Sequence, residues 1–502
     1  MITRLQIDGF KNLVGVDIHF GPFTCIAGPN GAGKSNLFDA IRFLGALASR
    51  QSLMQAASMV RDNHRAADIR SIFNRAGDKC ADQMRFGVEM IVPQNATDEL
   101  GQPAMASITF LRYDLELGLK NDPETGGSTL EIRREELLPI KRSEAGKLLP
   151  FPHKASTWRD SVVLGARRGG PYISTTEKDG MIVIQRHQDS GARTDDNKQE
   201  GGSRGRPIPA PAQSLKRTIV SAATAEAPTV LCAQREMESW LQLQLEPTAL
   251  RKSSDLNSSP HLKPNGEGLP ATLYRIARNS DSVDAIYARA ANRLAELIRD
   301  VRDITVERDE KLEQLTLVLT DLDGTRHPAR SLSDGTLRFL ALSVLEMDPG
   351  AHGVLCLEEP ENGIHPDRIT AMLRLLQDIA VDVSLAAGSE NPMRQVIINT
   401  HSPLVVGECP DDALVLARTI QSVAKSRTFN KVSFEGVTQT WRTKSEGQEI
   451  SRGQLLAYLN PLCLQSPPAP KRGAAEEPPP HRVRDRSDLM QTEFYPQLVA
   501  EQ

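Results

Sequence analysis

The sequence lacks the marks of a secreted, metal-scaffolded or membrane protein. Its six cysteines are scattered and none forms a Cys-x-x-Cys pair, which argues against a disulfide framework or a cysteine-held metal. No apolar run approaches the roughly 18 residues that a membrane helix needs. The first residues show no basic segment followed by an apolar one, as a secretion signal has. We therefore expect a cytoplasmic protein without a membrane partner.

A strong charge of either sign is also missing. The formal net charge of −4 gives no general attraction to nucleic acid, so DNA binding would need a local basic surface. Acids such as Glu135, Glu136 and Glu144 lie among the basic residues, which favours an ordinary solvated face, with DNA contact as the alternative. The basic candidates are Arg133, Arg134, Lys141, Arg142, Arg159, Arg167 and Arg168.

A phosphate-binding loop stands near the start of the chain. The run Gly28-Pro-Asn-Gly-Ala-Gly-Lys34-Ser35 fits a pattern whose glycines let backbone N–H groups wrap phosphates, whose lysine reaches the terminal ones and whose serine ligates Mg²⁺. The apolar run at 23–27 predicts a strand before the loop, and the spacing over 36–47 predicts a helix after it. The predicted nucleotide contacts are Gly28, Pro29, Asn30, Gly31, Ala32, Gly33, Lys34, Ser35 and Asn36.

Two adjacent carboxylates end a later apolar strand. Residues 354–357 run directly into Glu358 and Glu359, at the carboxyl edge of a predicted parallel sheet, where ligands bind. Successive side chains on a strand point to opposite faces, so one acid can hold the Mg²⁺ shell while the other polarises an attacking water. A lone Glu-Glu pair is usually a solvated strand end, but the phosphate loop earlier in the chain favours the functional interpretation.

Two shorter motifs gain meaning from their positions. The run Leu332-Ser-Asp-Gly-Thr336 comes shortly before the acidic strand, and alone it would be a turn and helix cap. His401 follows the apolar run at 395–398, and a lone histidine there would usually be structural. Their order after the phosphate loop is what suggests a shared site.

These four segments, in this order, resemble the ABC-type ATPase heads of the RecF, SMC and OLD proteins. Within that group they are most similar to the short RecF-like or OLD-like ATPases of bacterial defence and toxin–antitoxin loci. The resemblance implies that ATP binds at 28–35, the Walker A loop, and that Ser35 and Glu358 hold Mg²⁺. It also implies that Glu359 is the catalytic base.

The same resemblance implies a site built by two copies. Ser333 and Gly335 belong to the signature motif, which faces the nucleotide held by the opposite protomer, so ATP would join two chains head to head. Residues 360–366 correspond to the D-loop region, and His401 to the switch histidine that contacts the terminal phosphate.

Two departures from the family pattern leave these roles intact. The signature reads Ser-Asp-Gly-Thr in place of Ser-Gly-Gly-Gln, but Ser333 and Gly335 keep the hydroxyl and the close backbone approach. Glu358 stands where Asp is commoner, and the longer side chain still reaches a hydrated Mg²⁺. The family's Q-loop glutamine stays open between Gln185 and Gln234.

We expect an α/β fold: an ABC-type P-loop ATPase head with a mixed sheet, an antiparallel β subdomain, an inserted helical lobe and a disordered C-terminal tail. Strand-like stretches from 84 to 186, with a hairpin turn at Asp179-Gly180, predict the β part. Helical periodicity over 229–244 and 269–300 predicts the lobe, and it lacks the sustained heptads of an SMC rod.

The predicted division of the chain into domains and linkers follows from these patterns. The parts are the first part of the head at 1–187, a flexible loop at 188–213, the helical lobe at 214–300, the second part of the head at 301–420, and a variable, largely disordered segment at 421–502. In the last part, 464–488 is the segment expected to be disordered, and 489–498 could dock on a partner.

The first functional hypothesis is an ATP-hydrolysing switch in bacterial phage defence or genome maintenance. OLD proteins carry a TOPRIM nuclease, and the residues after Arg418 offer no acidic strand end with a later Asp-x-Asp, so a nuclease or toxin effector would be a separate protein. The alternative is a RecF-like clamp in which ATP controls residence on DNA. The Glu359 carboxylate disfavours a passive scaffold, and the long insertion between Gly28 and Gly335 disfavours a transport subunit.

Overall fold

The computed structural model describes most of the first 458 residues. The described residues are 1–60, 68–77, 79–121, 127–165, 170–187, 189, 208–424, 427–443, 449–450, 454–455 and 458. They belong to a compact unit, Met1–Leu459, and Asn460–Gln502 form a second unit. The tail predictions for 464–488 and 489–498, and the candidates Arg167 and Arg168, lie outside the described residues.

A seven-stranded mixed sheet carries the predicted motifs. Its order is β14-β19-β20-β3-β21-β22-β23, and the first five strands are parallel while β21 and β22 form an antiparallel hairpin. The strands are β3 (Phe23–Ala27), β14 (Leu241–Leu243), β19 (Gly353–Glu358), β20 (Arg394–Thr400), β21 (Leu414–Ala424), β22 (Arg427–Val437) and β23 (Glu449–Ile450). The apolar side chains of β19 and β20 are divided between two hydrophobic clusters, so both faces of these strands are buried.

The predicted antiparallel β part is an eight-stranded sheet. Its order is β13-β12-β11-β10-β9-β6-β1-β2, and the turn between β11 and β12 places Asp179 and Gly180 at positive φ, as a tight hairpin requires. The strands are β1 (Ile2–Asp8), β2 (Val16–His19), β6 (Gln83–Ile91), β9 (Phe110–Asn121), β10 (Ser128–Pro139), β11 (Ile173–Lys178), β12 (Met181–Arg186) and β13 (Ile208–Pro211).

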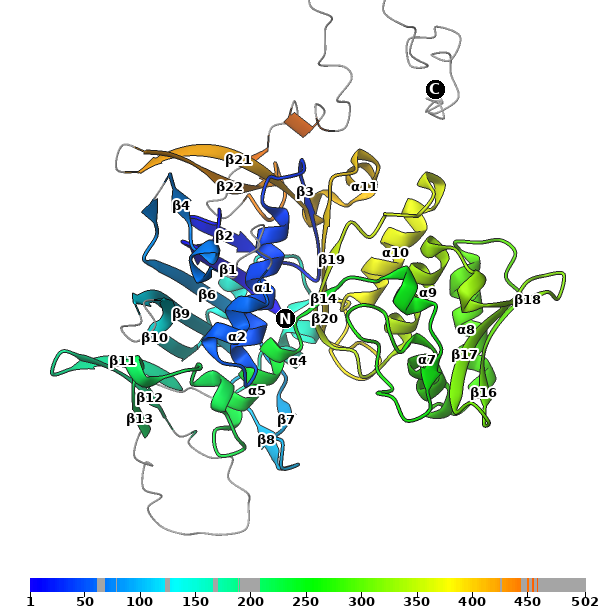
Figure 1. Ribbon diagram of the computed structural model, residues 1–502, viewed down its shortest axis with the longest axis horizontal. Helices are drawn as coiled ribbons and strands as arrows, with labels where there is room; N and C mark the ends of the chain where they lie inside the picture. The colour runs from blue at the N-terminus through cyan, green and yellow to red at the C-terminus, as the bar shows by residue number, and fades with distance from the viewer. Residues whose placement is uncertain are drawn as a thin grey trace, which may run out of the picture. The chain divides into compact units, whose positions relative to one another are not determined.

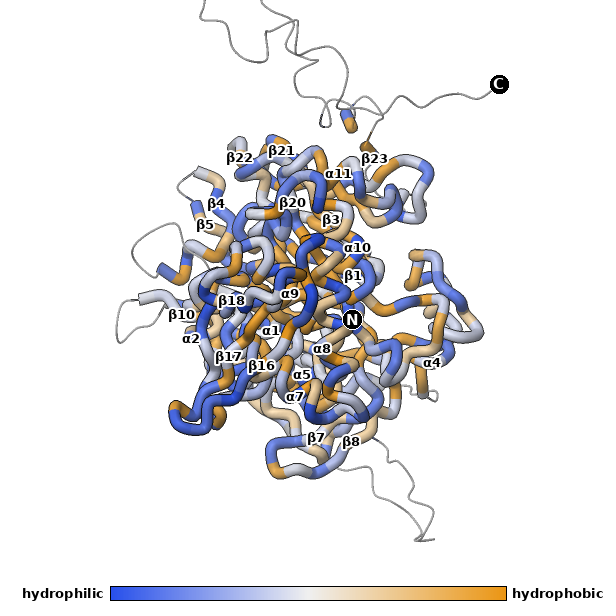
Figure 2. Tube along the Cα trace, turned by 90° about the vertical axis from the view of Figure 1, so that its right-hand side faces the viewer, coloured by the Kyte–Doolittle hydropathy of each residue, from blue (hydrophilic) through white to orange (hydrophobic). Residues whose placement is uncertain are grey.

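Two helices join the two sheets into one hydrophobic core. Helix α1 (Lys34–Ala48) follows the phosphate loop, and α5 (Pro228–Glu238) packs against it. Buried residues of both helices and both sheets form a single cluster. Figure 1 shows α1 between the strands of the eight-stranded sheet and β3, β19 and β20. Figure 2 shows hydrophobic segments gathered in the middle of the described part and hydrophilic segments along its outer turns.

A second core lies between the helical lobe and the seven-stranded sheet. Helices α7 (Leu269–Arg278), α8 (Val283–Ala295), α9 (Asp334–Met347) and α10 (Ile369–Ile379) contribute to it, with α7 and α8 packed against a small sheet. That sheet consists of β15 (Ser254–Asp255), β16 (Asp303–Asp309), β17 (Gln314–Thr320) and β18 (Arg326–Pro328). The remaining short elements are α2 (Leu53–Ser58), β4 (Arg75–Ala76), β5 (Lys79–Cys80), β7 (Asn95–Thr97), β8 (Pro103–Met105), α3 (Ala145–Leu148), α4 (Asp160–Val162), α6 (Pro247–Leu250) and α11 (Pro403–Glu408).

The structure differs from the predicted boundaries in three places. The boundary at 420 falls inside β21, and the hairpin continues to Val437 because Val432 and Val437 bury their side chains. In the loop predicted at 188–213, residues 208–211 form β13, which pairs with β12, while 188 and 190–207 lie outside the described residues. The part predicted as a helical lobe at 214–300 divides between the two cores, because α5 packs on α1 while α7 and α8 belong to the second core.

Two observations concern the length and the apolar character of the helices. The longest helix among the described residues is α1, with 15 residues, so that part of the chain holds no coiled-coil rod. In the same part, no helix is both long and apolar enough to cross a membrane.

Candidate nucleotide site

The phosphate loop lies between β3 and α1, as its sequence predicts. Gly33 has a φ of 109°, and a Cβ there would come within 2.4 Å of the Asn12 amide. That amide belongs to the turn after β1, and it also accepts a hydrogen bond of 2.8 Å from the side chain of Asn36. Lys11 beside it pairs with buried Asp39 of α1 at 2.9 Å. The turn after β1 therefore contacts both the phosphate loop and α1 and stabilises their positions.

Lys34 is folded back onto its own loop. Its ammonium donates to the carbonyls of Gly28 at 2.6 Å and Pro29 at 3.0 Å. The residue is only 6% exposed, and this burial lowers the pKa of Lys34 although three nearby acids, Glu359, Glu361 and Glu358, oppose the shift. A phosphate oxygen would replace these carbonyls as the partner of the ammonium.

The two predicted Mg²⁺ residues meet although they are far apart in the chain. The Ser35 hydroxyl donates to Glu358 Oε2 at 2.8 Å, across 323 positions of sequence. The parallel pairing of β3, β20 and β19 accounts for this, because it brings the loop after β3 and the end of β19 to the same edge of the sheet.

A glutamine that the sequence reading missed completes this contact. Gln242 of β14 donates to Glu358 Oε1 at 2.5 Å. The two glutamines considered earlier lie elsewhere: Gln185 is in β12 of the antiparallel sheet, and the Gln234 amide donates to the carbonyls of Ala48 and Ser221. The Leu-Gln-Leu-Gln-Leu alternation at 241–245 is typical of a strand and could have pointed to Gln242.

Glu359 is held from both sides. One carboxylate oxygen lies 2.7 Å from His401 Nδ1, and the other accepts from the Asn362 amide at 2.9 Å. Burial alone would raise the pKa of Glu359, but the hydrogen bonds from Asn362 and His401 and the charge of Lys34 together lower it. The backbone of Glu359 has a φ of 46°, a conformation that non-glycine residues rarely adopt and that tends to occur at functional sites.

The histidine is fixed through its neighbours. The Thr400 hydroxyl donates to Glu361, and it accepts from the backbone N–H of Ser402 at 2.9 Å. Glu361 is 8% exposed, and burial raises the pKa of its carboxyl. The flanking residues are thus anchored, while the His401 side chain stays 44% exposed.

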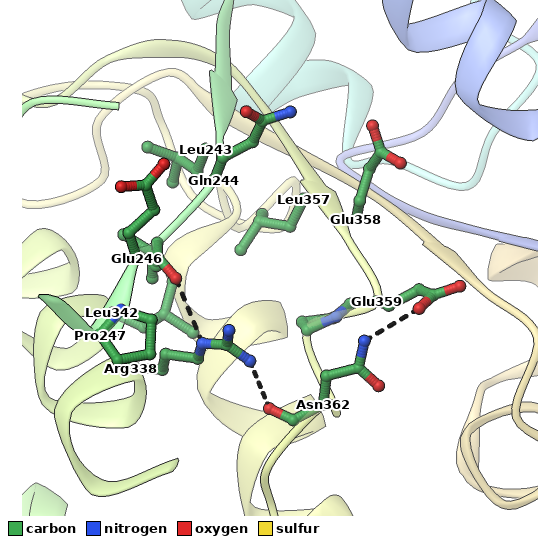
Figure 3. Close-up of a pocket in the computed structure, with 12 residues that line it drawn as sticks. Leu243, Gln244, Glu246, Pro247, Arg338, Leu342, Leu357, Glu358, Glu359 and Asn362 are labelled. Carbon is green, nitrogen blue, oxygen red and sulfur yellow. Dashed lines mark hydrogen bonds between the residues drawn. The ribbon is translucent and has the colours of Figure 1, made fainter. Parts of the chain in front are cut away.

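An arginine of α9 connects the segment that follows Glu359 to the segment that follows β14. Arg338 donates to the carbonyl of Asn362 at 2.5 Å and to that of Leu245, just after β14, at 3.2 Å. These residues line a cavity of about 260 Å³ that also includes Glu358 and Glu359. Figure 3 shows Arg338 reaching toward Asn362, whose amide turns to the Glu359 carboxylate.

The signature residues begin α9. The Ser333 side chain accepts from the backbone N–H of Thr336 at 3.2 Å and so caps the helix. A Cβ on Gly335 would come within 2.4 Å of the Gly363 carbonyl, so a glycine is needed here for packing inside the chain. Ser333 itself is exposed, and its hydroxyl lies 2.7 Å from that of Thr336.

Most of the described basic candidates for DNA binding have acidic partners. Arg133 pairs with Glu131 at 3.3 Å and Arg134 with Glu136 at 2.8 Å. Lys141 and Arg142 pair in the same way with Glu144 and Asp160. The pairing supports the solvated interpretation of this face.

Two family models match the chain over the segments that form this site. "AAA domain, putative AbiEii toxin, Type IV TA system" matches residues 236–407, and "RecF/RecN/SMC N terminal domain" matches residues 1–98. Over the segments that form this site, the chain resembles the ABC-type ATPases of the RecF, SMC and OLD group. The first match contains Glu358, Glu359 and His401, and the second contains the whole phosphate loop.

Individual relatives are similar to this chain over parts of their length. The OLD nuclease of Thermus scotoductus is 49% identical over 41 residues, which are 8% of this chain and 8% of that protein. The DNA replication and repair protein RecF of Clavibacter sepedonicus is 26% identical over 176 residues, 34% of this chain and 42% of that protein. The chain thus spans less than half the length of the curated relatives it matches.

Solved structures of SMC heads are more distant. The SMC head bound to the C-winged helix domain of ScpA has a TM-score of 0.41 and 14% identity, with 87% of this chain and 98% of that chain covered. The SMC head domain from Thermotoga maritima has a TM-score of 0.34 and 12% identity, with the same two coverages.

Proposed function

We propose that this chain binds ATP with Mg²⁺ on the loop between β3 and α1 and hydrolyses it with a water activated by Glu359. The observation that carries the proposal is the 2.8 Å contact between Ser35 and Glu358. It brings the phosphate loop and the acidic strand end to one point, and Glu359 follows directly.

The residues at this point fit a bound Mg²⁺. The ion prefers oxygen ligands and is usually held by one or two protein side chains together with phosphate oxygens. The Ser35 hydroxyl and the Glu358 carboxylate offer such oxygens, and the Gln242 amide lies against the same carboxylate. When bound, the ion would neutralise charge on the terminal phosphates.

Glu359 and His401 have distinct proposed tasks. The lowered pKa keeps the Glu359 carboxylate ionised at neutral pH, so it can accept a proton from a water. His401 is partly exposed and hydrogen-bonded to that carboxylate, a position from which it would contact the terminal phosphate and keep Glu359 oriented.

We also infer that ATP closes a head-to-head dimer. Ser333 at the start of α9 is exposed, and the Glu359–His401 pair is open on one side. A second chain that covers the pair with its own Ser333 would exclude water from the phosphates and strengthen every charged contact there.

The biological role we propose is a switch or sensor in bacterial phage defence or genome maintenance, with a separately encoded effector such as a nuclease or toxin. The match to the family model of the putative AbiEii toxin and the short match to the OLD nuclease support this role. A RecF-like ATP-gated DNA clamp is the second candidate, because the match to RecF extends over 176 residues.

The test is a comparison of the wild-type chain with Glu359→Gln. We expect the substitution to lower kcat by about 10²- to 10⁴-fold, and to accumulate a dimer in ATP and Mg²⁺ that light scattering or sedimentation detects. Glu246→Gln, an exposed carboxylate of the same cavity, is the matched control and should hydrolyse normally. Unchanged hydrolysis in Glu359→Gln would refute the assigned base.

The same measurement with duplex DNA separates the two roles. A dimer and a turnover rate that ignore DNA support the switch with a protein effector. A dimer or turnover that requires DNA, with affinity that falls steeply with salt, supports the clamp.

A further inference from the structure

The acidic residue in the signature has a cationic partner from another element. Asp334 is the first residue of α9, and its carboxylate lies 2.5 Å from Arg251 Nη2. The same nitrogen donates to the carbonyl of Leu332 at 3.0 Å. Arg251 therefore contacts both sides of Ser333 in the sequence.

Arg251 comes from the segment that leads away from Gln242. It directly follows α6, which begins four residues after β14 ends. The Arg251 side chain is 30% exposed and that of Asp334 52% exposed. The ion pair therefore lies at the surface beside Ser333, where a second copy of the chain would approach.

An acid at this position opposes the task of the signature. The nucleotide held by a second chain would bring its terminal phosphate toward Ser333, and a carboxylate on the next residue would repel it. A guanidinium has five N–H donors in a planar fork, and it binds carboxylates and phosphates equally well. It can therefore keep Asp334 neutralised while it offers further donors to an arriving phosphate.

We propose that Arg251 contacts the terminal phosphate of the nucleotide held by the partner chain and neutralises Asp334 there. Arg251 and Asp334 together take the place of the uncharged residue found in the common signature. The inference rests on the proposed ATP-closed dimer and adds a residue to its signature side.

The experiment measures ATP-dependent self-association in a Glu359→Gln background. Arg251→Ala should weaken the dimer formed in ATP and Mg²⁺ at least tenfold, measured by analytical ultracentrifugation. Adding Asp334→Asn to Arg251→Ala should recover at least a third of that loss, because the unpaired carboxylate is then removed. The dimer affinity of Arg251→Lys should lie between those of the parent and Arg251→Ala, because lysine keeps the positive charge but lacks the planar set of N–H donors.

A second readout separates this role from simple support of the loop. Arg251 acts on the partner's nucleotide, so ATP binding to the single chain, measured at concentrations too low for association, should not change in Arg251→Ala. The melting temperature in the absence of nucleotide should also remain close to that of the parent.

Two outcomes would overturn the inference alone. One is unchanged association in Arg251→Ala. The other is equal weakening in the single and double variants together with a lowered melting temperature, which would mean that the pair only ties α6 to α9. If the Glu359→Gln parent itself shows no ATP-dependent association, the proposed dimer fails and this inference fails with it.

Discussion

At the scale of single residues, Glu135 is a buried carboxylate that lies outside the nucleotide site. Glu135 of β10 is fully buried and accepts hydrogen bonds from the backbone N–H groups of Ile219 and Val220 and from the Tyr113 hydroxyl. Burial raises its pKa to about 7 despite these donors. The sequence placed Glu135 on a solvated face, and it could not reveal the burial because the covering segment lies more than 80 positions later.

The raised pKa predicts how stability depends on pH. The folded chain holds the Glu135 proton more tightly than the unfolded chain, whose carboxyl has a pKa of 4.5. The stabilisation is therefore fully present below pH 4.5 and is lost as pH rises through about 7. We expect the midpoint of unfolding by heat or denaturant to be lower at pH 8 than at pH 5. In Glu135→Gln, this midpoint should depend less on pH.

Exposed Glu177 of β11 provides the control for that measurement. Glu177→Gln should keep the pH dependence of the wild-type chain, because the Glu177 side chain is exposed to water in the folded chain as it is in the unfolded chain. If the unfolding midpoint depends on pH as steeply in Glu135→Gln as in the wild-type chain, Glu135 is not the group that causes the dependence.

At the scale of elements, the sequence predicted many of the strands and helices with long patterns, but neither the short strand β14 nor the hairpin of β21 and β22. Helical periodicity was read over 229–244, but α5 ends at Glu238 and β14 begins at Leu241. Three residues carry too little pattern to reveal a strand, and it is the parallel pairing with β19 that fixes it. The Q-loop candidate was missed for this reason, since Gln242 lies in β14.

Helix α9 makes a testable contribution to catalysis through Arg338. Its guanidinium joins the carbonyl after β14 to the carbonyl of Asn362, whose amide holds Glu359. We expect Arg338→Ala to lower kcat about tenfold or more and to leave KM for ATP nearly unchanged, because the carboxylate loses its orientation and the nucleotide loses no contact. Steady-state hydrolysis measures both constants.

An arginine on the neighbouring helix serves as the comparison for Arg338. Arg374 is exposed on α10, so Arg374→Ala should hydrolyse at the wild-type rate. A raised KM with normal kcat in Arg338→Ala would place that residue at the nucleotide instead.

At the scale of the whole molecule, the two halves of the site come from opposite ends of a long insertion. The motifs and their order were enough to predict that Ser35, Glu358, Glu359 and His401 come together, because parallel strands bring their carboxyl ends to one edge. The sequence did not single out Arg338 or Arg251, and it gave Asn362 no task of its own within the D-loop region, since their contacts depend on how the lobe packs against that edge.

The site as a whole should need two chains, and mixing variants tests this. Lys34→Ala removes the phosphate contact, and Ser333→Arg blocks the signature, so neither variant should hydrolyse ATP alone. A mixed dimer pairs the intact loop of one chain with the intact signature of the other. An equimolar mixture should therefore regain about a quarter of the wild-type rate, since half of the random dimers are mixed and each has one complete site of two.

Lys34→Ala mixed with the Lys34→Ala/Ser333→Arg double variant has no intact loop and should regain nothing. A mixture no more active than the sum of its parts would show that each chain hydrolyses ATP without a partner.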